Sequence, residues 1–148
     1  MMAKERANIL IEALPYIREY HDQSIVSKYG GNAMIDDALK RAVIQDVLLL
    51  RLVGIHVVLV HGGGPDISEM LRKVDIPSRF ENGLRVTTKE TMEIVQMVLC
   101  GKVNKDLVGL LEGQGVGLSG MDGGLFRAVP YRDESEVDYG YVGEVIDV

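Results

Sequence analysis

The sequence has 148 residues, of which 47% are hydrophobic and 26% charged, as expected for one globular domain. The formal net charge of −6 argues against a nucleic-acid-binding protein, because no basic surface is available to neutralise phosphates. No apolar stretch approaches the ~20 residues of a membrane span, and the charged start lacks a signal-peptide core, which predicts a cytoplasmic protein without membrane contact. Cys100 is the single cysteine, and we interpret it as a buried structural thiol.

The first 22 residues are predicted to form a helical extension ahead of the main domain. Pro15 falls inside the helical pattern, where we expect it to kink or break the helix. Because this helix precedes the first strand, its apolar stripe must be covered by the body of the domain or by another subunit. The stripe comprises Ile9, Leu10, Ala13, Leu14, Ile17 and Tyr20.

Residues 24–61 have the pattern of a strand, a helix and a second strand. A short strand at 24–29 and a β-branched strand at 55–61 flank a helix that Asp36 or Asp37 can cap and that Gly54 ends. Strands joined in this way lie parallel, which predicts an α/β fold with a mainly parallel sheet between helices. The helix is expected to turn four side chains inward: Leu39, Val43, Val47 and Leu50.

Both predicted strands end in a glycine-rich turn. Gly62-Gly63-Gly64-Pro65 leads into a helix that reaches about Lys73, and backbone N–H groups of such a turn can face one small anion. Gly30 and Gly31 follow the first strand, where the ammonium of Lys28 can reach phosphoryl oxygens. We therefore expect the two turns and Lys28 to form one cradle for a phosphoryl group. A Walker loop is absent, and no G-x-G-x-x-G motif follows either of the two strands.

Other interpretations of the second turn are less favoured. His61 could act as a base, but a histidine at a strand end beside glycines is more often structural. The string from His61 to Gly64 also occurs as an oxyanion element in lipases and esterases, which need a G-x-S-x-G elbow and a later histidine. Ser119 lacks the final glycine of that elbow, and all three histidines precede it. No Cys/His cluster has the spacing of a metal site.

The second half of the chain is predicted to begin with a β-hairpin. Asn82-Gly83 separates the extended segments 78–81 and 84–86 and favours a two-residue turn. Arg85, on the second segment, can hold a carboxylate through two parallel hydrogen bonds.

A long helix is predicted after the hairpin. Thr87 and Glu90 match a capping box, and the helical pattern continues past a bend at Gly101 to Leu111. Asn104 and Lys105 are either polar residues facing a site or part of an exposed helix surface, and exposure is favoured. Short strands are expected at 116–118, 125–128 and 142–148.

Six strings occur in a fixed order along nearly all of the chain: Lys28–Met34, Val60–Pro65, Asn82–Thr87, Glu93–Leu99, Gly101–Lys105 and Gly140–Val145. Together they resemble the N-acetylglutamate kinases of the amino-acid kinase family. The first two strings alone resemble the wider family of carbamate, aspartate, glutamate and uridylate kinases, and the third narrows the resemblance to the acetylglutamate branch. Ser27 departs from the family, which usually has an apolar residue before the lysine.

The resemblance implies transfer of the γ-phosphoryl group of ATP, with Mg²⁺, to the γ-carboxylate of N-acetyl-L-glutamate in arginine biosynthesis. Lys28 would be the catalytic residue that stabilises the transferring group, and Gly30 and Gly31 would approach the ATP phosphates. Gly63 and Gly64 would offer N–H groups to the substrate. Arg85 would hold its α-carboxylate.

The resemblance also implies an organisation. Residues 1–22 would be an oligomerisation helix, because it is similar to the extension that links dimers in hexameric, arginine-inhibited members. Residues 23–148 would be a substrate-binding lobe. We expect a homo-oligomer, which would be a dimer or, through the N-terminal helix, a hexamer. Family chains continue into a C-terminal ATP-binding lobe, and we expect the chain without it to be nearly inactive. A non-catalytic binding or oligomerisation module, or a related kinase with another acidic substrate, remains an alternative.

Overall fold

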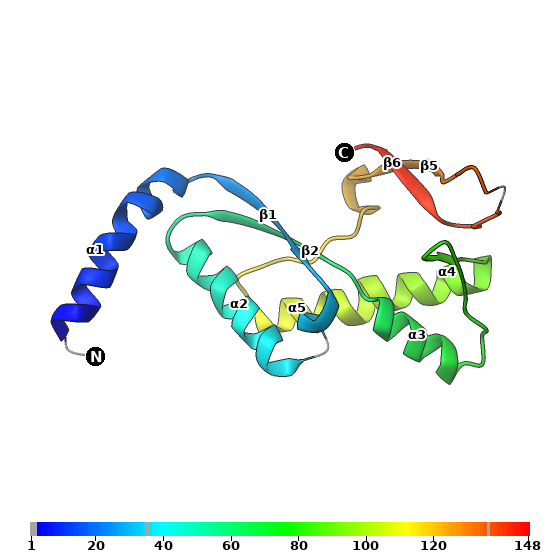
Figure 1. The fold of residues 1–148 in the computed structure, drawn as a ribbon, viewed down its shortest axis with the longest axis horizontal. Helices are drawn as coiled ribbons and strands as arrows, with labels where there is room; N and C mark the ends of the chain where they lie inside the picture. Colours follow the sequence, from blue (N-terminus) through cyan, green and yellow to red (C-terminus); the bar gives the residue numbers. More distant parts are fainter. Residues whose placement is uncertain (1–2, 35, 136) are drawn as a thin grey trace. The chain divides into compact units, whose positions relative to one another are not determined.

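A computed structural model describes residues 3–34, 36–135 and 137–148 (Figure 1). The chain forms two compact units, Met1–His61 and Gly62–Val148, and each is described by itself. Within the described ranges, no helix is both long and apolar enough to cross a membrane.

The first unit is built on a parallel pair of strands, β1 (Ser24–Tyr29) and β2 (His56–His61). Ser24 lies opposite His56 and Tyr29 opposite His61, so both strands end at the same edge. This pairing confirms the predicted strand–helix–strand unit and the α/β class. Alternate residues face opposite sides, and one side of the pair is exposed along Val26, Val58 and Val60.

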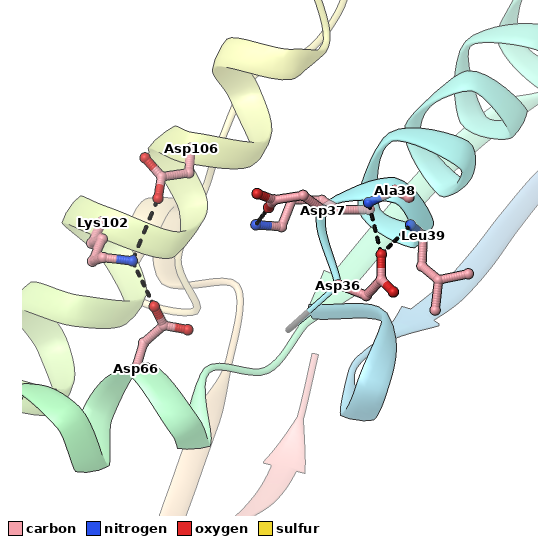
Figure 2. Close-up of polar contacts among 8 residues, drawn as sticks. Asp36, Asp37, Ala38, Leu39, Asp66, Lys102 and Asp106 are labelled. Atoms are coloured by element: carbon pink, nitrogen blue, oxygen red, sulfur yellow. Dashed lines mark hydrogen bonds and ion pairs between the residues drawn. The ribbon is translucent and has the colours of Figure 1, made fainter.

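Helix α2 (Asp37–Leu52) joins the two strands and contacts β2. The Asp36 carboxylate caps it, accepting hydrogen bonds from the N–H groups of Ala38 and Leu39 at 2.8 and 3.0 Å (Figure 2). Gly54, with φ +91°, follows its end as predicted. The prediction of an inward Leu39 is wrong, since this side chain is 48% exposed. The buried stripe is centred on Ile44, which lies about 140° around the helix axis from Leu39.

Helix α1 (Ala3–Tyr20) precedes β1 and contains Pro15. Of the kink or break expected at Pro15, the break is wrong, because the helix runs through this position. The proline φ angle fits a helix, so the helix continues despite one lost backbone hydrogen bond and the crowding of the ring against the preceding turn. None of the helix residues is buried in the described structure.

The second unit is a helical core with two antiparallel strand pairs. It contains α3 (Gly64–Lys73), β3 (Arg79–Glu81), β4 (Leu84–Val86), α4 (Lys89–Gln96), the π-helix η2 (Met97–Val103) and α5 (Asn104–Leu110). The 3₁₀ turn η3 (Asp122–Gly124), β5 (Arg127–Pro130) and β6 (Gly143–Asp147) follow. Helix α3 packs against α4 and η2. The buried apolar residues of the second unit are Ile67, Leu71, Val98, Val103, Leu107 and Tyr139.

The β3–β4 hairpin forms as predicted. Asn82 and Gly83 have φ angles of +51° and +82°, as a type I′ turn requires. The predicted cap of the following helix is wrong by one residue: the Thr88 hydroxyl accepts the Thr91 N–H at 3.2 Å. The Thr87 hydroxyl instead donates to the carbonyl of Arg85 at 2.9 Å.

Two further expectations fail after η2. Asn104 is buried, with 8% exposure, and its amide donates to the carbonyl of Leu118 at 3.2 Å. Segment 116–118 is not a strand. Its carbonyls accept hydrogen bonds from side chains, since the Lys105 ammonium also donates to the carbonyl of Gly117 at 3.1 Å. Lys105 itself is exposed, as expected. The strand expected at 125–128 begins at Arg127, and the last strand is Gly143–Asp147.

Candidate functional site

Arg85 stands on β4 with its guanidinium turned toward the start of α3. Its Nη2 atom lies 2.8 Å from the hydroxyl of Ser68 and 3.5 Å from the carbonyl of Gly64. Its Nη1 atom donates to the hydroxyl of Ser78. The Phe80 ring lies against the guanidinium, with its centroid 4.5 Å from Cζ. The half-buried arginine is thus held in one orientation, with planar donors that suit a carboxylate.

Partial burial changes the electrostatics of this group. Desolvation lowers the pKa of Arg85 from its ordinary value, because the charged form is less well hydrated there. An arginine keeps its charge at neutral pH even after such a decrease. A buried cation is stabilised by a bound anion, so this position favours a negatively charged ligand.

Gly63 and Gly64 form the amino end of α3. Gly63 is the N-cap residue, with extended backbone and no side-chain cap, and Pro65 occupies the first turn. Unpaired N–H groups at such an end, together with the helix dipole, attract an anion. The structure thus brings Gly63, Gly64 and Arg85, all named from the sequence, to one place in the second unit.

Close packing against η2 explains why position 63 is a glycine. A β-carbon on Gly63 would stand 2.5 Å from Cδ2 of Leu99 and 3.4 Å from Cγ2 of Val103. Gly64 has open space around it instead, with no atom within 4 Å. The backbone of Gly64 is therefore accessible to a ligand, while Gly63 fixes the helix start against η2.

Lys102 is a site-supporting residue that sequence reasoning missed. Its ammonium lies 2.5 Å from the carboxylate of Asp66 in the first turn of α3 and 3.6 Å from that of Asp106 (Figure 2). The hydrogen bond that Lys102 donates to Asp66 is the main reason why the pKa of Lys102 is raised. The pair ties the start of α3 to η2. Asp66, following Gly64-Pro65, was the available signal, but its partner is 36 residues away.

Lys28, Gly30 and Gly31 lie in the first unit. Lys28 is exposed, one residue before the end of β1, and pairs in register with Val60. A β-carbon on Gly30 or Gly31 would meet no atom within 4 Å, and Gly31 has φ +64°. The backbone after β1 is thus open to a ligand such as a phosphate group.

The alternative hydrolase interpretation gains nothing from Ser119. Its hydroxyl donates to the carboxylate of Asp122 at 2.8 Å, and its N–H is bonded to the same oxygen. The Ser119 contacts lower the pKa of Asp122. These bonds form a local turn, as is common for Asp and Ser side chains.

Comparison with known proteins decides the family. Residues 23–147 match the Amino acid kinase family. The chain belongs to this family. Among curated relatives, this amino acid kinase chain is 53% identical to an acetylglutamate kinase of Carboxydothermus hydrogenoformans, covering 97% of this chain and 52% of that protein. It is also 53% identical to an acetylglutamate kinase of Bifidobacterium longum subsp. infantis, covering 100% and 50%.

Solved structures agree on the fold. An N-acetylglutamate synthase from Neisseria gonorrhoeae, complexed with coenzyme A and N-acetyl-glutamate, superimposes with a TM-score of 0.73 over 93% of this chain and 32% of that chain, at 24% identity. A Streptococcus mutans protein superimposes with a TM-score of 0.64 over 84% of this chain and 50% of that chain, at 32% identity. The chain thus has an amino acid kinase fold and spans about half the length of the curated relatives it matches.

Proposed function

We propose that this chain recognises N-acetyl-L-glutamate for an acetylglutamate kinase reaction that uses ATP. The observation that carries the proposal is the Arg85 guanidinium, held by Ser68, Ser78 and Phe80 beside Gly64 at the amino end of α3. A ligand with two carboxylates suits this place, because the guanidinium takes one and the helix start can take another negative group. The names of the curated relatives support the same substrate.

In the proposed reaction, an oxygen of the γ-carboxylate bonds to the γ-phosphorus of ATP, and the bond from that phosphorus to the bridging oxygen of ADP breaks. Lys28 would be the catalytic residue, since an ammonium next to the transferring group stabilises its charge. Gly30 and Gly31 would approach the phosphates, and Gly63 and Gly64 would donate N–H groups to the substrate. Arg85 would hold the α-carboxylate.

ATP is normally used with Mg²⁺, which neutralises its phosphate oxygens. Among residues 3–34, 36–135 and 137–148, no group of three His, Cys, Asp or Glu side chains could hold a metal ion. Since Mg²⁺ in such reactions is held largely by the nucleotide phosphates and one or two carboxylates, no residue of this chain is assigned to the ion.

Assembly is a second part of the proposal. The described residues of α1 include none that is buried, and six large apolar side chains on it are exposed. We propose that residues 1–22 join subunits into a homo-oligomer, since an apolar helix face is stable only when covered. A biosynthetic kinase that uses ATP is expected in the cytoplasm.

Calorimetry with N-acetyl-L-glutamate tests the substrate proposal. The wild-type chain should bind, and Arg85→Ala should weaken binding at least about tenfold, because a charge-assisted bidentate contact is lost. Arg79→Ala is the matched control, since Arg79 lies on the same hairpin, is exposed and pairs only with Glu81 among the ion pairs of the described residues. Equal binding by Arg85→Ala and wild type, or tighter binding of N-acetyl-L-aspartate, would contradict the proposal.

A further inference from the structure

Residues 139–141 are tied to the β3–β4 hairpin through the backbone of Thr87. The Thr87 N–H donates to the carbonyl of Tyr139 at 3.0 Å, and the Tyr141 N–H donates to the carbonyl of Thr87 at 2.8 Å. Gly140, between them, has φ +66°, and a β-carbon there would stand 2.2 Å from the Thr87 oxygen. Only a glycine allows this approach without strain. The first tie therefore fixes the end of the hairpin strand that carries Arg85.

A second tie is made by the Tyr139 side chain at the tip of the same hairpin. Its hydroxyl accepts a hydrogen bond from the Asn82 amide at 2.9 Å and donates to the Asp133 carboxylate at 2.6 Å. Ser135 lies 3.2 Å away. Tyr139 is 1% exposed, and its ring meets that of Tyr131 edge to face at 5.5 Å. Hydrogen bonds from Ser135 and from Tyr139 lower the pKa of Asp133, so it is a carboxylate acceptor at neutral pH.

The two ties flank Arg85 in the sequence and on the hairpin. Asn82 forms the turn before it, and Thr87 follows it and donates its hydroxyl to the Arg85 carbonyl. We propose that Tyr139 is a positioning residue for Arg85, clamping the hairpin through its hydroxyl at Asn82 and through its carbonyl at Thr87. This inference rests on the proposed role of Arg85 in substrate recognition.

The chemistry of the buried ring supports a role beyond packing. A phenylalanine would fill the same volume, whereas a buried hydroxyl is costly unless it is fully hydrogen-bonded. Here the hydroxyl accepts a hydrogen bond from the Asn82 amide on the hairpin and donates one to the Asp133 carboxylate. It thus connects two parts that are 57 residues apart in the chain. A small shift of the hairpin would move the guanidinium away from Ser68 and Gly64.

Tyr139→Phe tests the clamp because it removes the hydroxyl and keeps the ring. Tyr131→Phe is the matched control, since it removes a hydroxyl from the neighbouring ring and leaves the hydrogen bonds of Asn82, Asp133 and Tyr139 in place. Asn82→Gly is a second variant that breaks the same bond from the other side and still suits the type I′ turn. Hydrogen exchange of residues 79–87 and chemical-shift titration with two ligands are measured for each. The ligands are N-acetyl-L-glutamate and 4-acetamidobutanoate, which lacks the α-carboxylate.

Tyr139→Phe and Asn82→Gly should each raise hairpin exchange on the order of fivefold, as expected for one lost hydrogen bond. They should weaken the binding of N-acetyl-L-glutamate by a similar factor and leave the binding of 4-acetamidobutanoate unchanged. Tyr131→Phe should change neither hairpin exchange nor the binding of N-acetyl-L-glutamate. Unchanged hairpin exchange, or equal weakening of both ligands, would overturn the inference. If the wild-type chain binds no N-acetyl-L-glutamate, the proposed function fails, and hairpin exchange still decides whether Tyr139 clamps Arg85.

Discussion

The side chain of Leu99 fills the space in which Gly63 would carry a β-carbon, with its Cδ2 atom 2.5 Å from that position. The π-helix η2 and the amino end of α3 are therefore in direct contact, and the wide turn of η2 presents Leu99 and Val103 to the same backbone. π-helical segments occur often at functional sites. Here the segment supports the start of the helix that we propose for anion binding.

Gly63→Ala should lower the free energy of unfolding by about 1–2 kcal/mol, because the added methyl overpacks this contact and Leu99 has to move. Chemical denaturation measures the change. Gly64→Ala is the control for stability, since its added methyl would enter open space, and its effect should stay within about 0.5 kcal/mol. In a Leu99→Ala background, Gly63→Ala should cost less. Equal destabilisation by both glycine variants would contradict the packing argument.

Asp66→Asn should destabilise the folded chain by up to about 1 kcal/mol, because it removes the closer, less exposed partner of Lys102. Asp106→Asn should have a smaller effect, since its oxygen lies 3.6 Å away and its side chain is 63% exposed. The folded pKa of Lys102 is raised above its ordinary value of 10.5, so the contribution of the pair is complete below that pH. It disappears as the pH rises through the raised value. Urea unfolding at pH 8 and at a series of pH values rising from 10.5 should show wild type and Asp66→Asn converging as Lys102 loses its proton.

Thr88→Ala should cost about 1 kcal/mol of stability, because it removes the side-chain cap of α4. Glu90→Ala, which would remove the capping box expected from the sequence, should change stability by only a few tenths of a kcal/mol. Thermal unfolding of both variants distinguishes the observed cap from the expected one. A larger loss for Glu90→Ala than for Thr88→Ala would favour the capping box expected from the sequence.

Deleting residues 1–20 should lower the molar mass measured by light scattering, because α1 carries the apolar face that we propose to join subunits. Leu10→Gln, at a position 68% exposed, should weaken assembly in the intact chain. Glu12→Gln is the control on the same helix. A mass equal to one chain for the wild type would contradict the proposed assembly.

The elements with strong local signals could be predicted from the sequence. Strands β1 and β2, the stop at Gly54 and the Asn82-Gly83 turn each depend on local backbone preferences, and all are found. The sequence left the helix cap open between Asp36 and Asp37, and the structure has Asp36. The three site residues of the second unit also lie on elements with local signals: Arg85 follows the hairpin turn, and Gly63 and Gly64 begin a helix.

The errors have tertiary causes. Thr87 and Thr88 are equally good caps by composition, but the backbone of Thr87 is bonded to Tyr139 and Tyr141, and the helix is capped by Thr88. Asn104 is polar and lies on a helix, so the sequence favoured exposure, yet the carbonyl of Leu118 gives it a buried partner. Lys102 was missed because its carboxylate partner belongs to another helix. The positions of Lys28, Gly30 and Gly31 in one cradle with Gly63 and Gly64 stay a prediction.

The uncovered valines of β1 and β2 have a practical consequence. Val26, Val58 and Val60 are 69%, 52% and 45% exposed and stand in one stripe on the open side of a parallel strand pair, a kind of sheet that is normally covered on both sides. Concentrated stocks of this chain will tend to precipitate, and sulfate or phosphate buffers will strengthen that tendency by promoting apolar burial. Dilute samples in chloride buffers are the better starting point for handling it.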